Sequence, residues 1–141
     1  MNAIVVGTDG SPGAEAAVQK VIELAQGSGA TVHLVCAFPA PSALERIGMT
    51  ARQEPTDLRG VAYDVLARGE RRLTEAGFEV EKHAREDDPA HAIIDVAAEQ
   101  KADLIAVGAR GSTGLRRFML GSVPSKLSHH SPSSLLIVRE D

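Results

Sequence analysis

The chain has 141 residues, the size of one ordinary domain, and a formal net charge of −4. This acidic balance argues against the basic surface of nucleic-acid-binding and membrane-surface proteins, so we expect neither partner. Hydrophobic residues make up 43% of the chain and aromatic residues only 3%. An aliphatic core of this kind favours a parallel α/β structure and argues against an aromatic platform for single-stranded nucleic acid.

The single cysteine, Cys36, falls within an apolar segment at residues 32–38, where a buried core thiol is expected. One cysteine cannot form a disulfide within the chain, which favours a reducing compartment. The N-terminal residues lead directly into an apolar strand without the pattern of a secretory signal. No apolar run approaches the roughly 18 residues of a membrane helix. We therefore predict a cytoplasmic protein.

The first forty residues predict a strand, a helix and a second strand. Residues 3–8 (AIVVGT) are continuously apolar up to Thr8, as in a strand buried on both faces. Ser11 is placed to cap a helix from Pro12 to about residue 26, which the glycines at 27 and 29 end. A second apolar run covers residues 31–38. The buried face of this helix is expected to carry Ala16, Ala17, Val21, Leu24 and Ala25.

Residues 39–56 contain three prolines and show no clear period, which predicts a long loop with one helical turn near 43–47. Loops of this length in compact domains often form lids or partner surfaces. A disordered connector is the equally weighted alternative.

The second half of the chain alternates helices and strands in the same way. A helix is expected over 57–76, a strand with one wet side near a sheet edge over 78–84, and a helix that Asp88 caps and Pro89 begins. A buried strand over 104–107 precedes a glycine-rich segment at 108–122. Ser122 then caps a helix to residue 130, and a final strand covers 135–138. The expected buried positions of the two long helices are Val61, Val65, Leu66, Leu73 and Ala76, then Ile93, Ile94, Val96, Ala97 and Ala98.

Five strands alternating with four helices predict one α/β domain over residues 1–141, an open, doubly wound parallel sheet with strand order 3-2-1-4-5. Ligands of such sheets bind outside the carboxyl ends of the strands, where the strand order reverses. Two segments meet this condition: Gly7-Thr8-Asp9 after the first strand, and 108–122 after the fourth.

The segment at 108–122 has the composition of an anion site. It combines four glycines at 108, 111, 114 and 121 with three arginines and several hydroxyl groups. The Asp9 carboxylate is expected opposite this segment, where it can hydrogen-bond a ribose or an adenine edge, or help to hold Mg²⁺. For Arg110, a contact with phosphate and a solvent-facing position are both open.

Other nucleotide and catalytic signatures are absent from the sequence, namely GxxxxGK[ST], GxGxxG, GxSxG, HExxH and CxxC. The five histidines show no convincing metal-ligand spacing, so they are expected to be structural or solvated. Since no nucleophile–base pair or carboxylate pair stands out, we assign no catalytic residue, and we favour a binding protein over an enzyme.

The spacing Gly108-x₂-Gly111-x₉-Gly121-Ser122 resembles the G-2x-G-9x-G-[S/T] nucleotide-binding signature of the universal stress protein family. The segments Gly7–Ser11 and Asp88–Ala90 are also similar to that family, and the resemblance covers the whole chain.

This resemblance implies a nucleotide site in which Asp9 meets the nucleoside and Ala37 supports the adenine through its backbone. The first two glycines of the signature line the ribose and phosphates, and the last glycine, the serine and the next N–H group take the terminal phosphates. Pro124 has no N–H to add. The implied binding residues are Gly7, Thr8, Asp9, Ala37, Gly108, Ala109, Arg110, Gly111, Ser112, Gly121, Ser122 and Val123.

The resemblance further implies an ATP-binding stress-response regulator or switch, with or without Mg²⁺, whose regulatory partner the sequence does not name. Cyclic AMP or another adenine nucleotide, a nucleotide-independent interaction module, and a slow ATP hydrolase are the alternatives. Family members dimerise through their last strand, and the apolar segment Leu135–Val138 is expected to be an exposed sheet edge. We therefore predict a homodimer through this strand.

Overall fold

The computed structural model describes residues 1–40, 57–111 and 120–140. Its elements in chain order are β1 (Ala3–Gly7), α1 (Pro12–Ala25), β2 (Thr31–Phe38), α3 (Leu58–Glu75), β3 (Glu79–Glu86), α4 (Pro89–Glu99), β4 (Leu104–Gly108), α5 (Ser122–His130) and β5 (Ser134–Val138). The predicted loop lies outside the described residues from position 41 to 56, as does its predicted helical turn.

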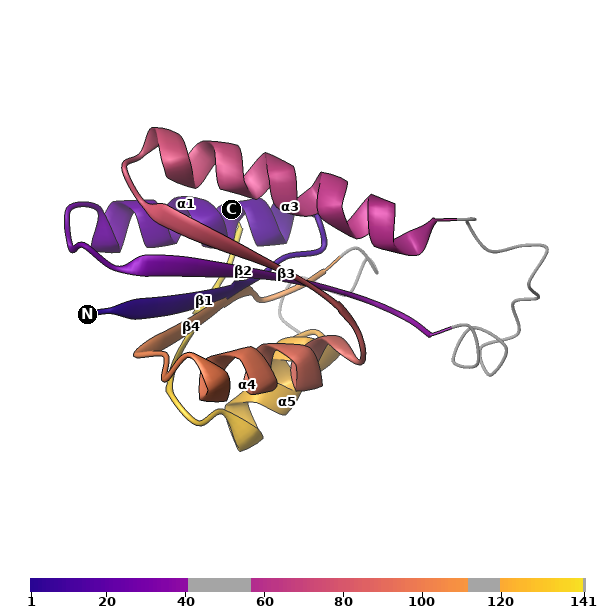
Figure 1. Cartoon of the computed structure of the whole chain (residues 1–141). Coiled ribbons are helices and arrows are strands. Elements are labelled where there is room, and N and C mark those ends of the chain that lie inside the picture. Colours follow the sequence, from indigo (N-terminus) through magenta and orange to yellow (C-terminus); the bar gives the residue numbers. More distant parts are fainter. Residues whose placement is uncertain (41–56, 112–119, 141) are drawn as a thin grey trace.

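The five strands form one parallel sheet in the order β3-β2-β1-β4-β5. Helices α1 and α3 cover one face and α4 and α5 cover the other (Figure 1). The predicted fold class and strand order are therefore confirmed. The chain runs outward from β1 to β2 and β3, then returns to the other side of β1 for β4 and β5, so the order reverses between β1 and β4.

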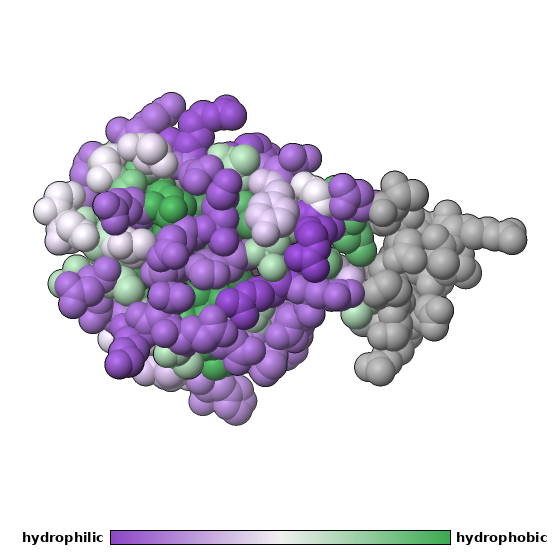
Figure 2. All heavy atoms as spheres, viewed as in Figure 1, coloured by the Kyte–Doolittle hydropathy of each residue, from purple (hydrophilic) through white to green (hydrophobic). Residues whose placement is uncertain are grey.

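The core consists of two aliphatic layers, one on each side of the sheet. The central strand β1 contributes to both, because Ile4 and Val6 face one layer and Val5 faces the other, all with no exposed surface. The strand is continuously apolar for this reason. The visible face of the molecule is mostly hydrophilic, with small hydrophobic patches (Figure 2).

Cys36 lies in the layer beneath α1 and α3, as the apolar run around it predicts. Burial, with a smaller contribution from the charge of Asp9, raises the pKa of its thiol to about 11. The thiolate form is therefore disfavoured at neutral pH, which identifies Cys36 as a packing residue.

Some predicted burial was wrong. Leu24 and Val61 are 65% and 52% exposed, and Ala98 is also exposed. Each lies at the edge of an apolar stripe that is narrower than the sequence indicates, because each helix buries only the side chains that face the sheet. Strand β3 also runs two residues further than predicted, to Glu86, because its backbone pairs with β2 as far as Phe38.

No helix in the described part of the chain combines the length and the apolar character needed to cross a membrane.

Candidate functional site

A cavity of about 260 Å³ opens at the carboxyl ends of β1, β2 and β4, where the strand order reverses. The starts of α1, α4 and α5 form its other walls. The lining residues are Gly7, Thr8, Asp9, Ser11, Ala14, Val35, Ala37, Pro89, Ile93, Val107, Gly108, Arg110, Gly111, Gly121, Ser122, Val123 and Pro124.

Most of the predicted site residues line this cavity. Ala109 does not: it is 2% exposed, its N–H donates to the Val138 carbonyl at 2.7 Å, and its own carbonyl accepts from the Gly121 N–H at 2.8 Å. These two hydrogen bonds connect Ala109, near the start of the glycine-rich segment, to the end of β5 and to Gly121 before α5. Ser112, Arg116 and Arg117 lie outside the described residues.

Gly108 is required by packing. A Cβ at this position would lie 2.6 Å from the Gly13 backbone, in the first turn of α1. A Cβ on Gly13 would in turn collide with the Arg110 carbonyl. The two glycines therefore allow the start of α1 to approach the end of β4 beside the cavity.

Asp9 lies beside Gly111, in the described part of the glycine-rich segment. Its Oδ1 accepts the Ser11 N–H at 2.9 Å, which fixes the turn between β1 and α1. A Cβ on Gly111 would lie 2.9 Å from Asp9 Oδ2. One carboxylate oxygen is thus engaged by the turn, and the other lies beside Gly111 in the cavity wall.

The start of α5 differs from the starts of the other described helices. Ser11, Asp57 and Asp88 each cap their helix through a side-chain oxygen. In α5 the N-cap is Gly121, without a side-chain hydrogen bond, and Ser122 is the first helical residue. Ser122 was expected to be the cap itself, and this detail of the prediction was wrong. Within the part of the chain that the structure describes, no side chain caps the first turn of α5 at the cavity, a favourable position for an anion.

Arg110 forms an ion pair with Glu140, with Nη2 and Oε1 3.2 Å apart. The two side chains are 25% and 34% exposed. The guanidinium therefore contacts the segment after β5. The sequence left open a contact with phosphate or a solvent-facing position for Arg110, and this ion pair is a third arrangement.

Sequence reasoning missed the apolar wall of the cavity. Val35, Ile93 and Val107 come from β2, α4 and β4, with Pro89 at the α4 start. The Asp88-Pro89 helix start was visible in the sequence, and the carboxyl ends of buried strands were expected near the site. These apolar side chains form one wall of the cavity because of the strand order, which a local sequence pattern does not predict.

Two side-chain clusters contain histidines, one formed across two strands and one formed locally at the start of α4. His33 Nδ1 and His83 Nε2 lie 3.1 Å apart across β2 and β3, and His33 is 2% exposed. His91 lies between Asp87 and Asp95, beside the start of α4. The histidines were expected to be structural or solvated, and His91 is an exposed histidine with two neighbouring carboxylates.

The model of the family described as "Universal stress protein family" matches residues 1–139. Universal stress protein Rv1636 of Mycobacterium tuberculosis is 32% identical over 138 residues, which cover 96% of this chain and 94% of the relative.

Among solved structures, hypothetical protein MJ0577 shares the fold at a TM-score of 0.84 and 23% identity, over 99% of this chain and 96% of that one. A universal stress protein solved in complex with cAMP is 29% identical with a TM-score of 0.71, over 97% of this chain and 95% of that one. The family match over nearly the full length and the Mycobacterium relative lead to one conclusion: this chain belongs to the universal stress protein family.

Proposed function

We propose that the protein binds ATP in the cavity between β1 and β4 and acts as a nucleotide-responsive switch in a stress response. The observation that carries this proposal is the uncapped start of α5 at the cavity, beside glycine-rich backbone. Backbone N–H groups and a helix N-terminus stabilise phosphate, typically by 0.3–1 kcal/mol, and up to about 2 kcal/mol where partly buried.

The rest of the cavity suits the nucleoside. The apolar side chains Val35 and Ile93 offer a surface for a purine ring, and Ala37 at the end of β2 offers backbone groups to its polar edge. Asp9 is placed to accept hydrogen bonds from ribose hydroxyls. The cAMP complex of a 29% identical relative supports an adenine nucleotide as the ligand class.

Mg²⁺ would enter together with the phosphates. Among the described residues that line the cavity, Asp9 is the one carboxylate, and one of its oxygens already accepts the Ser11 N–H. This sparse set of acid–base groups is why we propose a binding switch and not an ATP hydrolase as the main function.

We also propose a homodimer through β5. The two edge strands of the sheet differ in character: β3 (EVEKHARE) is densely charged, whereas β5 (SLLIV) carries four consecutive apolar residues, of which Leu135, Leu136 and Ile137 are partly exposed. Charges protect an edge against pairing with another strand, and an apolar edge favours it.

The nucleotide site is tested at Gly121. Its φ of −68° and ψ of 171° suit any N-cap residue, so Gly121→Asp and Gly121→Asn both supply a favourable cap. Asp adds a negative charge where the phosphate is proposed, and Asn of nearly the same shape does not. Calorimetry on nucleotide-free protein should show ATP affinity at least tenfold weaker for Asp than for Asn.

Equal ATP affinities in the two variants would contradict a phosphate site at the start of α5. The absence of measurable binding of ATP, AMP and cAMP to the unmodified protein would overturn the whole proposal. Comparing these three nucleotides also decides which one the site prefers, since only ATP carries phosphates beyond the first.

A further inference from the structure

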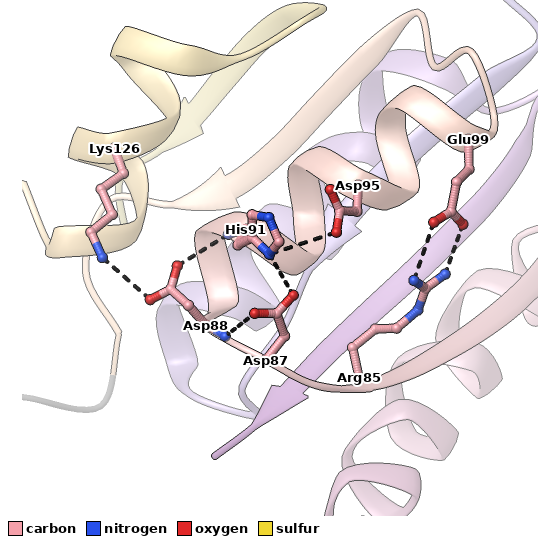
Figure 3. Close-up of polar contacts among 7 residues, drawn as sticks. All are labelled: Arg85, Asp87, Asp88, His91, Asp95, Glu99 and Lys126. Carbon is pink, nitrogen blue, oxygen red and sulfur yellow. Dashed lines mark hydrogen bonds and ion pairs between the residues drawn. The ribbon is translucent and has the colours of Figure 1, made fainter. Parts of the chain in front are cut away.

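Three side chains with metal-binding atoms converge on the outer side of the α4 start. His91 Nδ1 lies 2.6 Å from Asp87 Oδ2 and 3.6 Å from Asp95 Oδ2. His91 and Asp95 are four residues apart and share one face of the helix, and Asp87 reaches them from the turn before it. Figure 3 shows the imidazole between the two carboxylates.

Asp87 also supports the turn before α4, because its Oδ1 accepts the Asp88 N–H at 2.7 Å. Asp88 caps the helix, with Oδ2 accepting the His91 N–H at 3.1 Å, and its Oδ1 contacts Lys126 of α5 at 3.2 Å. Arg85 pairs with Glu99 through two contacts of 2.8 and 3.2 Å. The two neighbouring cations drawn in Figure 3 therefore make their ion pairs with other carboxylates, and Arg85 acts on Asp87 and Asp95 through its charge alone.

A single hydrogen on His91 Nδ1 cannot bond to both Asp87 and Asp95. Nδ1 carries at most one hydrogen, and its short contact to Asp87 uses it, while 3.6 Å to Asp95 is too long for a hydrogen bond. A divalent cation would bind all three atoms at once. Metal bonds of about 2.0–2.2 Å place adjacent ligand atoms about 2.9–3.5 Å apart.

The observed distances from His91 Nδ1 to the two carboxylate oxygens, 2.6 and 3.6 Å, lie just below and just above this range of ligand–ligand distances. The three ligand atoms all lie within 4.8 Å of one another. The His91, Asp87 and Asp95 side chains are 63%, 32% and 43% exposed, so small rotations can adjust them and an ion can enter from solvent.

We propose that Asp87, His91 and Asp95 form a site for a first-row divalent transition ion such as Zn²⁺ or Ni²⁺, with water completing its coordination. The imidazole nitrogen favours these ions over Mg²⁺ and Ca²⁺, which take oxygen ligands. Ile93, which lines the nucleotide cavity, is two residues from His91 and so points to nearly the opposite side of α4. The ion site is thus separate from the cavity.

The test is calorimetric titration of the nucleotide-free full chain with Zn²⁺. One ion per chain is expected at this site, with binding at least tenfold weaker in Asp95→Asn, which keeps the size of the side chain and removes its charge. His91→Ala should abolish it. The matched control is the double variant His129→Gln/His130→Gln, which removes an adjacent pair of exposed imidazoles on α5 and should leave the affinity unchanged.

Equal Zn²⁺ affinity in the unmodified chain, Asp95→Asn and His91→Ala would overturn the proposal. Loss of binding in the α5 double variant would overturn it as well, by placing the ion on α5. Mg²⁺ binding as tight as Zn²⁺ would contradict a transition-ion site. A readout without any substitution is the NMR spectrum of the histidine rings during titration with Zn²⁺, in which the His91 resonances should change first.

Discussion

At the scale of single residues, the glycines of the candidate site have different physical roles. Gly108 permits backbone contact between β4 and the start of α1, Gly111 lies beside Asp9, and Gly121 begins α5 without a side-chain cap. A signature read from the sequence treats these positions alike. The structure separates the glycine needed for folding from the one that leaves a helix start open.

Gly108→Ala should lower the free energy of unfolding by about 1–3 kcal/mol, because the new Cβ would lie 2.6 Å from the backbone of Gly13, which cannot move alone. Gly69→Ala is the matched control. Its Cβ would lie 3.0 Å from a side-chain methyl group of Leu34 and not from backbone, and alanine favours the helical state, so a smaller effect than at Gly108 is expected. Urea unfolding of both variants gives the comparison, and equal effects would contradict this role of Gly108.

At the scale of elements, the helices are held by narrow stripes of fully buried side chains. Leu66 on α3 has no exposed surface, whereas Leu24 on α1 is 65% exposed, although both belong to apolar stripes in the sequence. Leu66→Ala should cost about 2–5 kcal/mol of stability, and Leu24→Ala should change it by less than about 0.5 kcal/mol. Thermal unfolding measures both, and a large effect at Leu24 would show that the exposed leucine is covered in solution.

The pairing of β2 with β3 should depend on pH through His83. Burial lowers the pKa of His83, with further contributions from His33 and from Arg85, while Glu81 and Glu99 oppose them. The folded state therefore favours the neutral ring. Its contribution to stability is complete above the unfolded value of 6.5 and is lost as pH falls through the lowered folded pKa.

The stability difference between the unmodified chain and His83→Gln should therefore shrink as pH is lowered from about 7.5 to 5, because glutamine does not titrate. His129→Gln on the exposed side of α5 is the control, since it removes a histidine that has no part in the contact between β2 and β3. A difference that grows on acidification would show that the fold favours the charged ring.

At the scale of the whole molecule, the proposed dimer depends on which backbone groups β5 leaves open. The Val138 carbonyl accepts from the Ala109 N–H and so faces β4. Because successive residues of a strand direct their backbone groups to opposite edges, Leu136 also faces β4, and Leu135 and Ile137 face the open edge.

Ile137→Pro should therefore convert a dimer to a monomer while the fold persists, because it removes an N–H on the open edge. Leu136→Pro should instead disrupt the β4–β5 pairing and destabilise the fold. Ile137→Ala controls for loss of the side chain and should weaken the dimer less than proline does. Analytical ultracentrifugation gives the oligomeric state, and a dimer that persists in Ile137→Pro would place the interface elsewhere.

The sequence by itself determined the alternation of strands and helices, the helix starts at Ser11 and Asp88, the burial of Cys36 and the family signature in the segment 108–122. These are local properties, since periodicity, capping and turn chemistry act over a few residues. The alternation limits the number of possible sheet topologies without choosing among them, and the expected order 3-2-1-4-5 is that of a Rossmann-like fold.

Only the tertiary structure decided which distant residues meet. The approach of Gly13 to Gly108, the apolar wall from Val35 to Ile93, the His33–His83 contact and the ion pair of Arg110 with Glu140 each join separate elements. Side-chain burial at the stripe edges likewise depends on how each helix rests on the sheet, which is why Leu24 and Val61 were misjudged. Such contacts are set by packing across the sheet, and no pattern within a single segment records them.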